Sequence, residues 1–234
     1  MRKLVEGIVD FRERLLPQYA ARFRELATQQ SPDTLFVTCS DSRVVPNLLV
    51  STDPGDLFVM RNVGNLVPPA TREGASTGDV SEASAIEYSA LVLEVRNIVV
   101  CGHSACGAMK AALSRKAVPG APNLARWLQH ADAAVSRLEV EGAPDPALCR
   151  EDQLSQVNVL VQIEHLMSYP IVRERVAAGS LSVFGLWFDI GSGDMYAYEP
   201  PTRRFELLDR READRLLARL DDAQPRTPTP AIGP

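Results

Sequence analysis

Two short segments of this chain carry side chains that can bind a metal ion and act on its ligands. The segment CSDSR holds a thiol, a carboxylate and a guanidinium at Cys39, Asp41 and Arg43, and the segment GHSACG holds an imidazole and a thiol at His103 and Cys106. Two thiols and one imidazole form the donor set of a tetrahedral zinc site that keeps one position open. Sulfur and imidazole also favour zinc over magnesium or calcium, which prefer oxygen ligands.

Each segment begins where a predicted strand ends. Residues 35–39 and 97–102 are short, largely apolar runs, which are typical of strands inside parallel sheets. Ligands of open α/β sheets bind at the carboxyl ends of the strands, so we expect the two segments to converge. A lone cysteine at a strand end is usually a small buried hydrophobic residue. The occurrence of both halves at two strand ends of one chain favours a metal site.

Asp41 and Arg43 lie two residues apart on an extended segment, so their side chains point the same way and can form a bidentate pair. One interpretation is an ordinary surface ion pair, which contributes little to stability. The other is that Arg43 holds Asp41, and that Asp41 accepts a hydrogen bond from hydroxide on the metal or itself takes the fourth metal position.

The composition limits the class of protein. The net charge of −5 and the absence of a basic stripe argue against a nucleic-acid partner. The first 26 residues are too rich in charge for a signal peptide or a membrane span, so we expect a cytoplasmic protein without a membrane partner. Only four cysteines occur, which is too few for a disulfide-framed secreted fold. We expect Cys101, inside a strand, and Cys149, inside a helix, to be small buried hydrophobic residues.

The remaining pattern predicts an α/β fold, with a central, mostly parallel β-sheet flanked by helices and an N-terminal helical arm. Apolar residues recur at three- and four-residue steps over residues 4–26, which predicts an amphipathic helix that Pro17 breaks into two pieces. We expect one domain over residues 1–222, with the arm at 1–28, the core at 33–200 and a proline-rich disordered tail at 223–234. The other predicted elements are a strand at 57–60, helices at 78–94, 104–116, 122–139 and 146–178, and a hairpin over 181–200.

CSDSR, followed 64 residues after its cysteine by H-x-x-C, resembles the β-class carbonic anhydrases, and the likeness extends from about residue 26 to residue 200. The resemblance implies that Cys39, His103 and Cys106 bind one Zn²⁺ per chain and that Asp41 and Arg43 form the catalytic dyad. It implies reversible hydration of carbon dioxide to bicarbonate and a proton, by attack of hydroxide on zinc in a small apolar pocket.

Further positions match the plant-like branch of that family. The resemblance implies five residues that bind the substrate. Gln30 is the glutamine on the substrate side, and Gly107 is a backbone donor beside the metal. The walls of the apolar pocket are Phe58, Val63 and Tyr88. In the family some of these walls come from the neighbouring subunit. A homodimer, or a higher homo-oligomer built from dimers, is therefore expected, with the N-terminal helices clasping the partner.

One departure from part of the family concerns regulation. Members with a second bicarbonate pocket carry a Trp three residues before the first cysteine ligand and a Tyr on a late strand, where this chain has Phe36 and Phe188. We therefore expect the open form of the site, with Asp41 paired to Arg43.

Several alternatives stay open on the sequence. GHSACG superficially resembles the nucleophile elbow of α/β-hydrolases, with Ser104 as nucleophile, although Cys106 stands where the second glycine belongs. A structural or sensory zinc module closed by Asp41 is the non-enzymatic alternative. A relative acting on carbonyl sulfide or carbon disulfide would use the same site. His130 and His165 are expected to be ordinary helix residues rather than proton shuttles.

Overall fold

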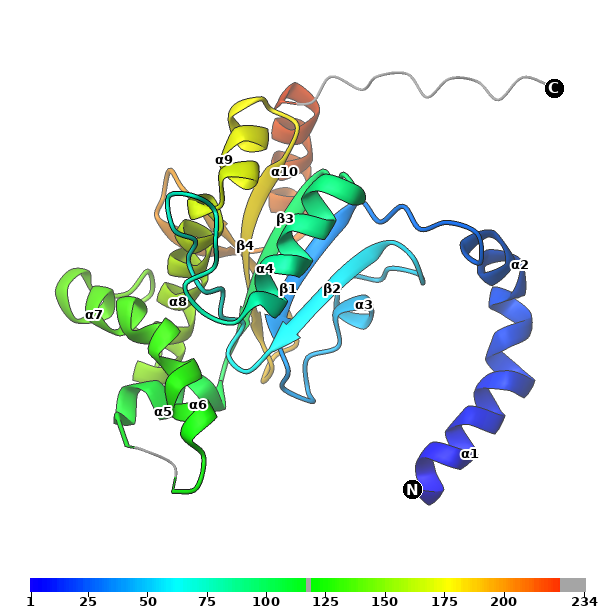
Figure 1. Ribbon diagram of the computed structural model, residues 1–234, viewed down its shortest axis with the longest axis horizontal. Helices are drawn as coiled ribbons and strands as arrows, with labels where there is room; N and C mark the ends of the chain where they lie inside the picture. The colour runs from blue at the N-terminus through cyan, green and yellow to red at the C-terminus, as the bar shows by residue number, and fades with distance from the viewer. Residues whose placement is uncertain (117–118, 224–234) are drawn as a thin grey trace.

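The computed structural model describes residues 1–116 and 119–223, and its centre is a six-stranded sheet with the order β2-β1-β3-β4-β5-β6 (Figure 1). The first four strands in space are parallel, and the last two are antiparallel additions. The strands are β1 (Thr34–Cys39), β2 (Leu57–Asn62), β3 (Asn97–His103), β4 (Ser182–Asp189), β5 (Asp194–Glu199) and β6 (Arg204–Leu207). The prediction of a mostly parallel α/β sheet is confirmed, and β6 is an addition to it.

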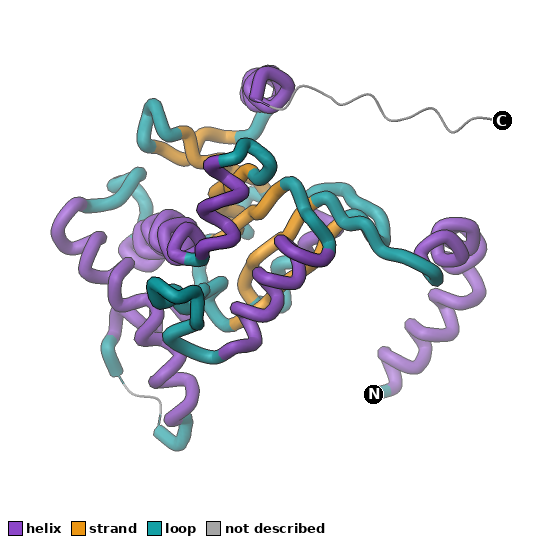
Figure 2. Tube along the Cα trace, turned by 45° about the horizontal axis from the view of Figure 1, so that its top comes forward, coloured by secondary structure: helices purple, strands orange, loops and turns teal. Residues whose placement is uncertain are grey.

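Alternate residues of the central strands fill two different cores. Leu35 and Val37 point into the larger core, which lies between the sheet and the helices α4 (Val80–Glu87), α8 (Arg150–Ser168) and α9 (Pro170–Ala177). A turn of π-helix, η2 (Tyr88–Val92), extends α4. Phe36 points into a smaller core on the opposite face, under the short helix α3 (Pro46–Leu49). The long helical cover therefore lies on one face of the sheet (Figure 2).

A third core lies at the carboxyl end of β1 and β3. It forms between α5 (Gly107–Ser114), α7 (Asp132–Glu141) and α8, with α6 (Pro122–Leu128) and the 3-10 turn η3 (Gln129–Ala131) at its edge. Helix α5 begins after Cys106 rather than at Ser104, because the chain first makes a tight turn from the end of β3.

The N-terminal arm stands away from the sheet (Figure 1). It consists of α1 (Arg2–Asp10), a π-helical turn η1 (Phe11–Leu15) and α2 (Leu16–Leu26). The ring centroids of Phe11 and Phe23 lie 6.3 Å apart. Twelve residues of straight helix span about 18 Å, so the helix axis bends. The π turn lies directly before Pro17, and the arm is a bent helix rather than two separate pieces.

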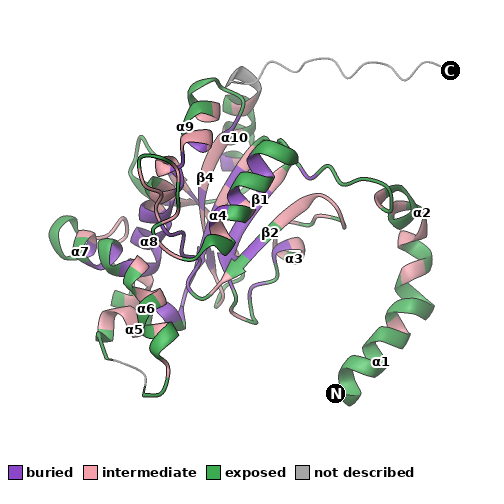
Figure 3. Cartoon of the chain, viewed as in Figure 1, coloured by how far each residue is buried: buried purple, intermediate pink, exposed green. Residues whose placement is uncertain are grey.

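None of the residues of α1, η1 and α2 is buried (Figure 3). Leu4 and Ile8 are 64% and 68% exposed. The base of the arm is attached to the turn before β2, where Arg22 binds Asp56 at 2.8 Å. The exposed apolar residues of α1 therefore find no partner within the described part of this chain.

The chain continues beyond the predicted hairpin into helix α10 (Arg210–Ala223). Its start is capped by Asp209, whose carboxylate accepts a hydrogen bond from the Glu212 amide at 2.9 Å. Arg219 fixes the helix to β5 through two bonds of 2.6 and 2.7 Å to the buried Glu199. Residue 223, placed in the tail by the sequence, is the last of α10, and residues 224–234 of the predicted tail lie outside the described residues. In the described ranges, none of the helices has the length and apolar character to cross a membrane.

Candidate metal centre

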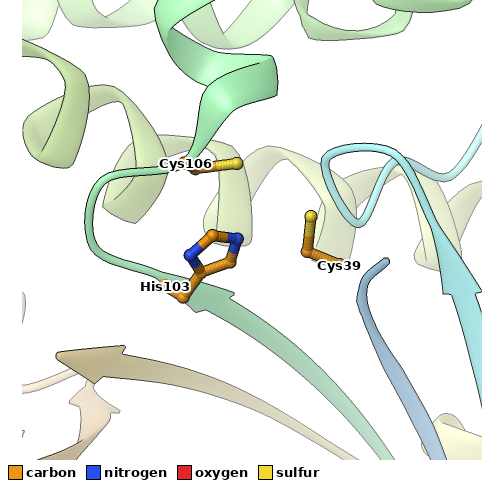
Figure 4. A group of neighbouring side chains, drawn as sticks. All are labelled: Cys39, His103 and Cys106. Atoms are coloured by element: carbon orange, nitrogen blue, oxygen red, sulfur yellow. The ribbon is translucent and has the colours of Figure 1, made fainter. Parts of the chain in front are cut away.

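Three metal-binding side chains meet at the carboxyl end of the sheet. Cys39 is the last residue of β1, His103 is the last residue of β3, and Cys106 immediately precedes α5. Their ligand atoms lie within 4.8 Å of one another, and all three residues are buried. Figure 4 shows the side chains pointing toward a common space. Ligand atoms of a tetrahedral zinc site with Zn–S bonds of about 2.3 Å lie about 3.7 Å apart, so small side-chain adjustments suffice to bind the ion.

The imidazole of His103 has one nitrogen engaged and the other unpartnered. Nδ1 lies 2.8 Å from the carbonyl oxygen of Ser104, which can only accept, so Nδ1 carries the proton. Nε2 is buried without a hydrogen-bond partner. A buried polar atom without a partner is costly. The lone pair of this nitrogen faces the two sulfurs, as a metal ligand requires, and the site fits a zinc ion.

The surroundings of the two thiols shift their pKa values in opposite directions. The Cys106 thiol, as the largest cause, and the Gly64 amide at 3.4 Å lower the pKa of Cys39, against the effect of burial. The same Cys39–Cys106 hydrogen bond and burial raise the pKa of Cys106. A divalent cation between the sulfurs favours the thiolate form of both, because a coordinating thiol is deprotonated.

Asp41 and Arg43 form the bidentate pair expected from their spacing. Arg43 donates from Nε to Oδ1 at 2.9 Å and from Nη2 to Oδ2 at 2.7 Å. These bonds are the largest cause that holds the pKa of Asp41 well below its usual range. Asp41 Oδ2 lies 4.0 Å from His103 Nε2. An ionised carboxylate is therefore held at the edge of the metal cluster without occupying it.

Arg61, on β2, holds the backbone that carries Cys39 and Asp41. Its guanidinium donates to the carbonyl oxygen of Cys39 at 3.0 and 3.1 Å and to that of Asp41 at 2.8 Å. Sequence patterns did not indicate this role, because Arg61 is separated from these residues in the chain and reaches them only through the pairing of β1 with β2.

Helix α8 supports the two loops of the centre with a stripe of polar side chains. Asp152 accepts from the Ala105 amide at 2.6 Å, and Ser155 donates to the His103 carbonyl at 2.8 Å. Asn158 donates to the Gly64 carbonyl at 3.1 Å. The three-residue spacing on a buried helix was the signal that could have identified them, since it places them on one face.

Comparisons with known proteins agree with this geometry. The family model for carbonic anhydrase matches residues 34–195. A carbonic anhydrase of Pseudomonas aeruginosa is 42% identical over 209 residues, covering 89% of this chain and 92% of its own length. Carbonic anhydrase 1 of Escherichia coli O157:H7 is 40% identical over 206 residues, covering 88% and 91%. The structure of the β-carbonic anhydrase CcaA superposes with a TM-score of 0.79 at 37% identity, covering 88% of this chain and 98% of that one.

The chain belongs to the β-class carbonic anhydrases. It is therefore an enzyme of the carbonic anhydrase class, and the cysteine–histidine cluster lies within the matched residues.

Ser104 has no hydrolase role in this carbonic anhydrase. Its hydroxyl donates to Asp189 at 2.9 Å and accepts from the Ile190 amide at 2.9 Å, which fixes the turn after β3 to the end of β4. The His103 ring faces Cys39 instead of this hydroxyl. The alternative of a nucleophile elbow is therefore wrong.

The five residues expected in the substrate pocket fall into two groups. Val63 precedes Gly64, whose amide contacts Cys39, and Gly107 is the first residue of α5, so both lie beside the centre. Phe58 pairs in register with Leu35, four residues before Cys39, which places it about 13 Å along the strands from the cluster.

Tyr88 and Gln30, like Phe58, lie away from the cluster. Tyr88 packs on Phe58 with ring centroids 5.8 Å apart, and Gln30 is exposed in the loop after α2. One chain therefore does not bring Gln30, Phe58 and Tyr88 to its own cluster.

The other two cysteines differ from each other. Cys101 is fully buried in β3, as expected, and burial raises its pKa to about 12. Cys149 is exposed at the N-cap of α8, so the expectation that it is buried was wrong. The amphipathic stretch around it continued the helical pattern, but the helix begins only at Arg150.

A cavity of about 840 Å³ opens beside the centre. It reaches Ser40 and Val63, the neighbours of Cys39 and Gly64, and extends between α4 and α6. Its lining residues are Ser40, Asn62, Val63, Thr77, Gly78, Asp79, Ser81, Glu82, Asn123, Arg126, Trp127, Gln129 and His130. His130 contacts Trp127 there, with ring centroids 5.3 Å apart.

Proposed function

We propose that this enzyme catalyses the zinc-dependent, reversible hydration of carbon dioxide to bicarbonate and a proton. The observation that carries the proposal is the buried, unpartnered His103 Nε2 facing the sulfurs of Cys39 and Cys106. The carbonic anhydrase relatives support the reaction. Each chain binds one Zn²⁺ through these three residues, which leave a fourth position open.

A zinc ion bound there lowers the pKa of water enough to supply hydroxide near neutral pH. Asp41 acts at the open position, because its Oδ2 lies 4.0 Å from His103 Nε2. Arg43 keeps this carboxylate ionised, so it can accept a hydrogen bond there but cannot donate one. With a metal bound, the dyad would therefore favour a ligand at the open position that carries a proton for Asp41 to accept.

The site adopts the open form, in which Asp41 is paired with Arg43. The two bonds between them, together with Phe36 and Phe188 in place of the residues of a second bicarbonate pocket, support this proposal. A permanently closed structural zinc site is disfavoured because it requires Asp41 to leave Arg43.

Carbon dioxide binds in a small apolar pocket walled by Phe58, Val63 and Tyr88, because it is uncharged and nearly apolar. Gln30 and the Gly107 amide stabilise the charge that develops on its oxygens. Val63 and Gly107 come from the same chain as the metal cluster. Phe58, Tyr88 and Gln30 come from a second copy, since they lie away from the cluster of their own chain.

A homodimer, or a larger homo-oligomer built from dimers, is the catalytic unit. The exposed apolar residues of the arm and of η2 support it, including Leu91 at 57% and Val92 at 62% exposure. One β-carbonic anhydrase structure with 32% identity and a TM-score of 0.72, which covers 84% of this chain and 95% of its own, is described as tetrameric and comes from Sordaria macrospora. The thiols of the centre must stay reduced, which is consistent with a cytoplasmic location.

The test is a stopped-flow assay of carbon dioxide hydration, with metal analysis of the same sample. We expect turnover that is lost on removal of the metal by a chelator and restored by zinc. Carbonyl sulfide and carbon disulfide are measured in parallel. A zinc-loaded protein that hydrolyses either one faster than it hydrates carbon dioxide would refute the proposed substrate.

A further inference from the structure

The turn between His103 and Cys106 contains a residue in an uncommon conformation. Ala105 has φ of +53°, in the left-handed region that residues other than glycine, asparagine and aspartate rarely adopt. Such a conformation persists only when the surrounding structure holds it, and it is often found at functional sites. The bonds made by Ala105 show what holds it here.

Both backbone groups of Ala105 bind a charged side chain. Its amide donates to Asp152 Oδ1 of α8 at 2.6 Å. Its carbonyl accepts from Nη2 of Arg43 at 3.1 Å. The same Nη2 donates its other hydrogen to Asp41 Oδ2 at 2.7 Å. Ala105 therefore connects α8 to the guanidinium that holds the catalytic carboxylate.

We propose that Asp152 is a positioning residue for the Asp41–Arg43 pair and acts through the backbone of Ala105. This inference rests on the function proposed above. Asp152 holds Ala105 in its left-handed conformation, which places the Ala105 carbonyl where Arg43 can bind it. The Nη2 group of Arg43 then donates one hydrogen to Ala105 and the other to Asp41. This orients the plane of the guanidinium for its two bonds to Asp41.

The surroundings of Asp41 show why the restraint on Arg43 affects the metal centre. Arg43 lies at the surface, with 45% of its side chain exposed, so its own surroundings restrain it only weakly. Without the bond to Ala105, the guanidinium of Arg43 is held only by its bonds to Asp41. The pair can then shift together and Asp41 can turn toward the cluster, since its Oδ2 is already 4.0 Å from His103 Nε2. Asp152 thus favours the open form over the form in which Asp41 occupies the metal position.

The experiment compares Asp152→Ala and Asp152→Asn in the full-length protein, loaded with zinc for kinetics and with cobalt for absorption spectra. Asp152→Ala should lower kcat about tenfold or more, the usual effect of removing a group that orients metal-site residues, while one metal per chain is retained. Its cobalt spectrum should change, because a carboxylate replaces solvent on the metal. Asp152→Asn keeps an acceptor oxygen and should restore kcat to within about threefold of the wild type.

Glu151→Gln is the matched control, because it removes a charge from the same first turn of α8 and leaves Asp152 in place. An Asp152→Ala variant with wild-type kcat and spectrum overturns the proposal. Equal losses in the Ala and Asn variants also overturn it, since the acceptor oxygen would then be irrelevant. If the Ala variant does not fold, Asp152→Glu is measured instead, because glutamate keeps the charge but displaces the acceptor oxygen. An unchanged cobalt spectrum in the Glu variant contradicts the inference. The cobalt spectra do not depend on turnover. They therefore test the role of Asp152 even if the protein does not hydrate carbon dioxide.

Discussion

At the scale of residues, the centre consists of side chains whose other bonds are already made. His103 Nδ1 is bound to the Ser104 carbonyl, which leaves only Nε2 for a metal. Asp41 is bound twice by Arg43, the Cys39 carbonyl accepts from Arg61, and the Cys39 sulfur accepts from the Gly64 amide. Because these bonds orient the donors in advance, binding of the ion requires little reorganisation.

Replacing any one of the three donors should remove the metal. We expect Cys39→Ala, His103→Ala and Cys106→Ala each to lose zinc and activity together, because two donors seldom bind zinc in a buried site. Zinc content is measured by atomic emission on purified protein. Cys149→Ser is the matched control, since it changes an exposed cysteine outside the centre and should keep one zinc per chain. Retention of zinc by all three alanine variants would refute the ligand assignment.

Replacing the dyad should separate zinc binding from turnover. Asp41→Asn and Arg43→Ala should keep one zinc per chain and lower kcat about tenfold to a hundredfold, because the acceptor at the open position is lost or displaced. Stopped-flow kinetics and metal analysis on the same samples check this. Full activity in both variants would show that Asp41 and Arg43 form only a surface ion pair.

At the scale of elements, the ends of β3 and β4 are joined by polar bonds. Asp189 accepts from the Gly191 amide at 3.0 Å and from Ser104 at 2.9 Å. These bonds, with the Gly191 amide as the largest cause, lower the pKa of Asp189 below its ordinary value. The turn after β3 is therefore attached to β4 through a carboxylate whose ionised form these bonds favour.

This carboxylate should make stability depend on pH. A folded pKa below the unfolded value of about 3.9 stabilises the fold at higher pH, and the contribution disappears as the pH falls through the folded pKa. We expect Asp189→Asn to lower the free energy of unfolding by about 1 kcal/mol at neutral pH, measured in urea. The difference from the wild type should shrink as the pH falls below about 4 and through the folded pKa of Asp189. A difference that is constant between pH 3 and pH 7 would contradict the role of the charge.

Helix α8 packs so closely on β3 that no side chain fits at Gly102. A Cβ built there would lie 2.8 Å from Val159 and 3.3 Å from the Ser155 carbonyl oxygen. Gly102→Ala should therefore cost about 1–3 kcal/mol of unfolding free energy, measured by thermal or urea denaturation. Gly7→Ala is the control, since its Cβ meets nothing within 4 Å and should be neutral or stabilising. An equally stable Gly102→Ala variant would show that α8 can move away.

The sequence predicted the helices and strands that can be recognised from a short run of neighbouring residues. Strands β1 and β3 are apolar runs, and their parallel order places Cys39 and His103 side by side. Helix α10 was missed because it is mostly charged, although Asp209 and Glu212 have the spacing of a helix cap. Asp152 could not be assigned to its loop either, because its contact with Ala105 depends on how α8 crosses the sheet.

At the scale of the whole molecule, the described chain exposes the apolar surface that a second copy would cover. Ile8 in the arm and Val92 in η2 are 68% and 62% exposed. The residues expected in the substrate pocket divide between the cluster and this surface. The sequence predicts all five positions, and in the proposed function an assembly of two chains brings them together.

A charge on the arm should break that assembly. We expect Ile8→Glu to shift the protein from dimers or larger species toward monomers in sedimentation velocity, because the apolar contact would bury a carboxylate. The monomer should show kcat lowered about tenfold or more, since the pocket is incomplete. Val140→Glu is the matched control, as Val140 is 85% exposed on α7. A fully active monomeric Ile8→Glu variant would refute the shared pocket.

X-ray absorption at the zinc edge of the purified wild-type protein tests the central claim most directly. Two sulfur neighbours at about 2.3 Å, one imidazole nitrogen at about 2.0–2.1 Å and one further light atom are expected from Cys39, His103, Cys106 and an open position. A shell without sulfur, or protein isolated with intact thiols that takes up no zinc, would contradict the account.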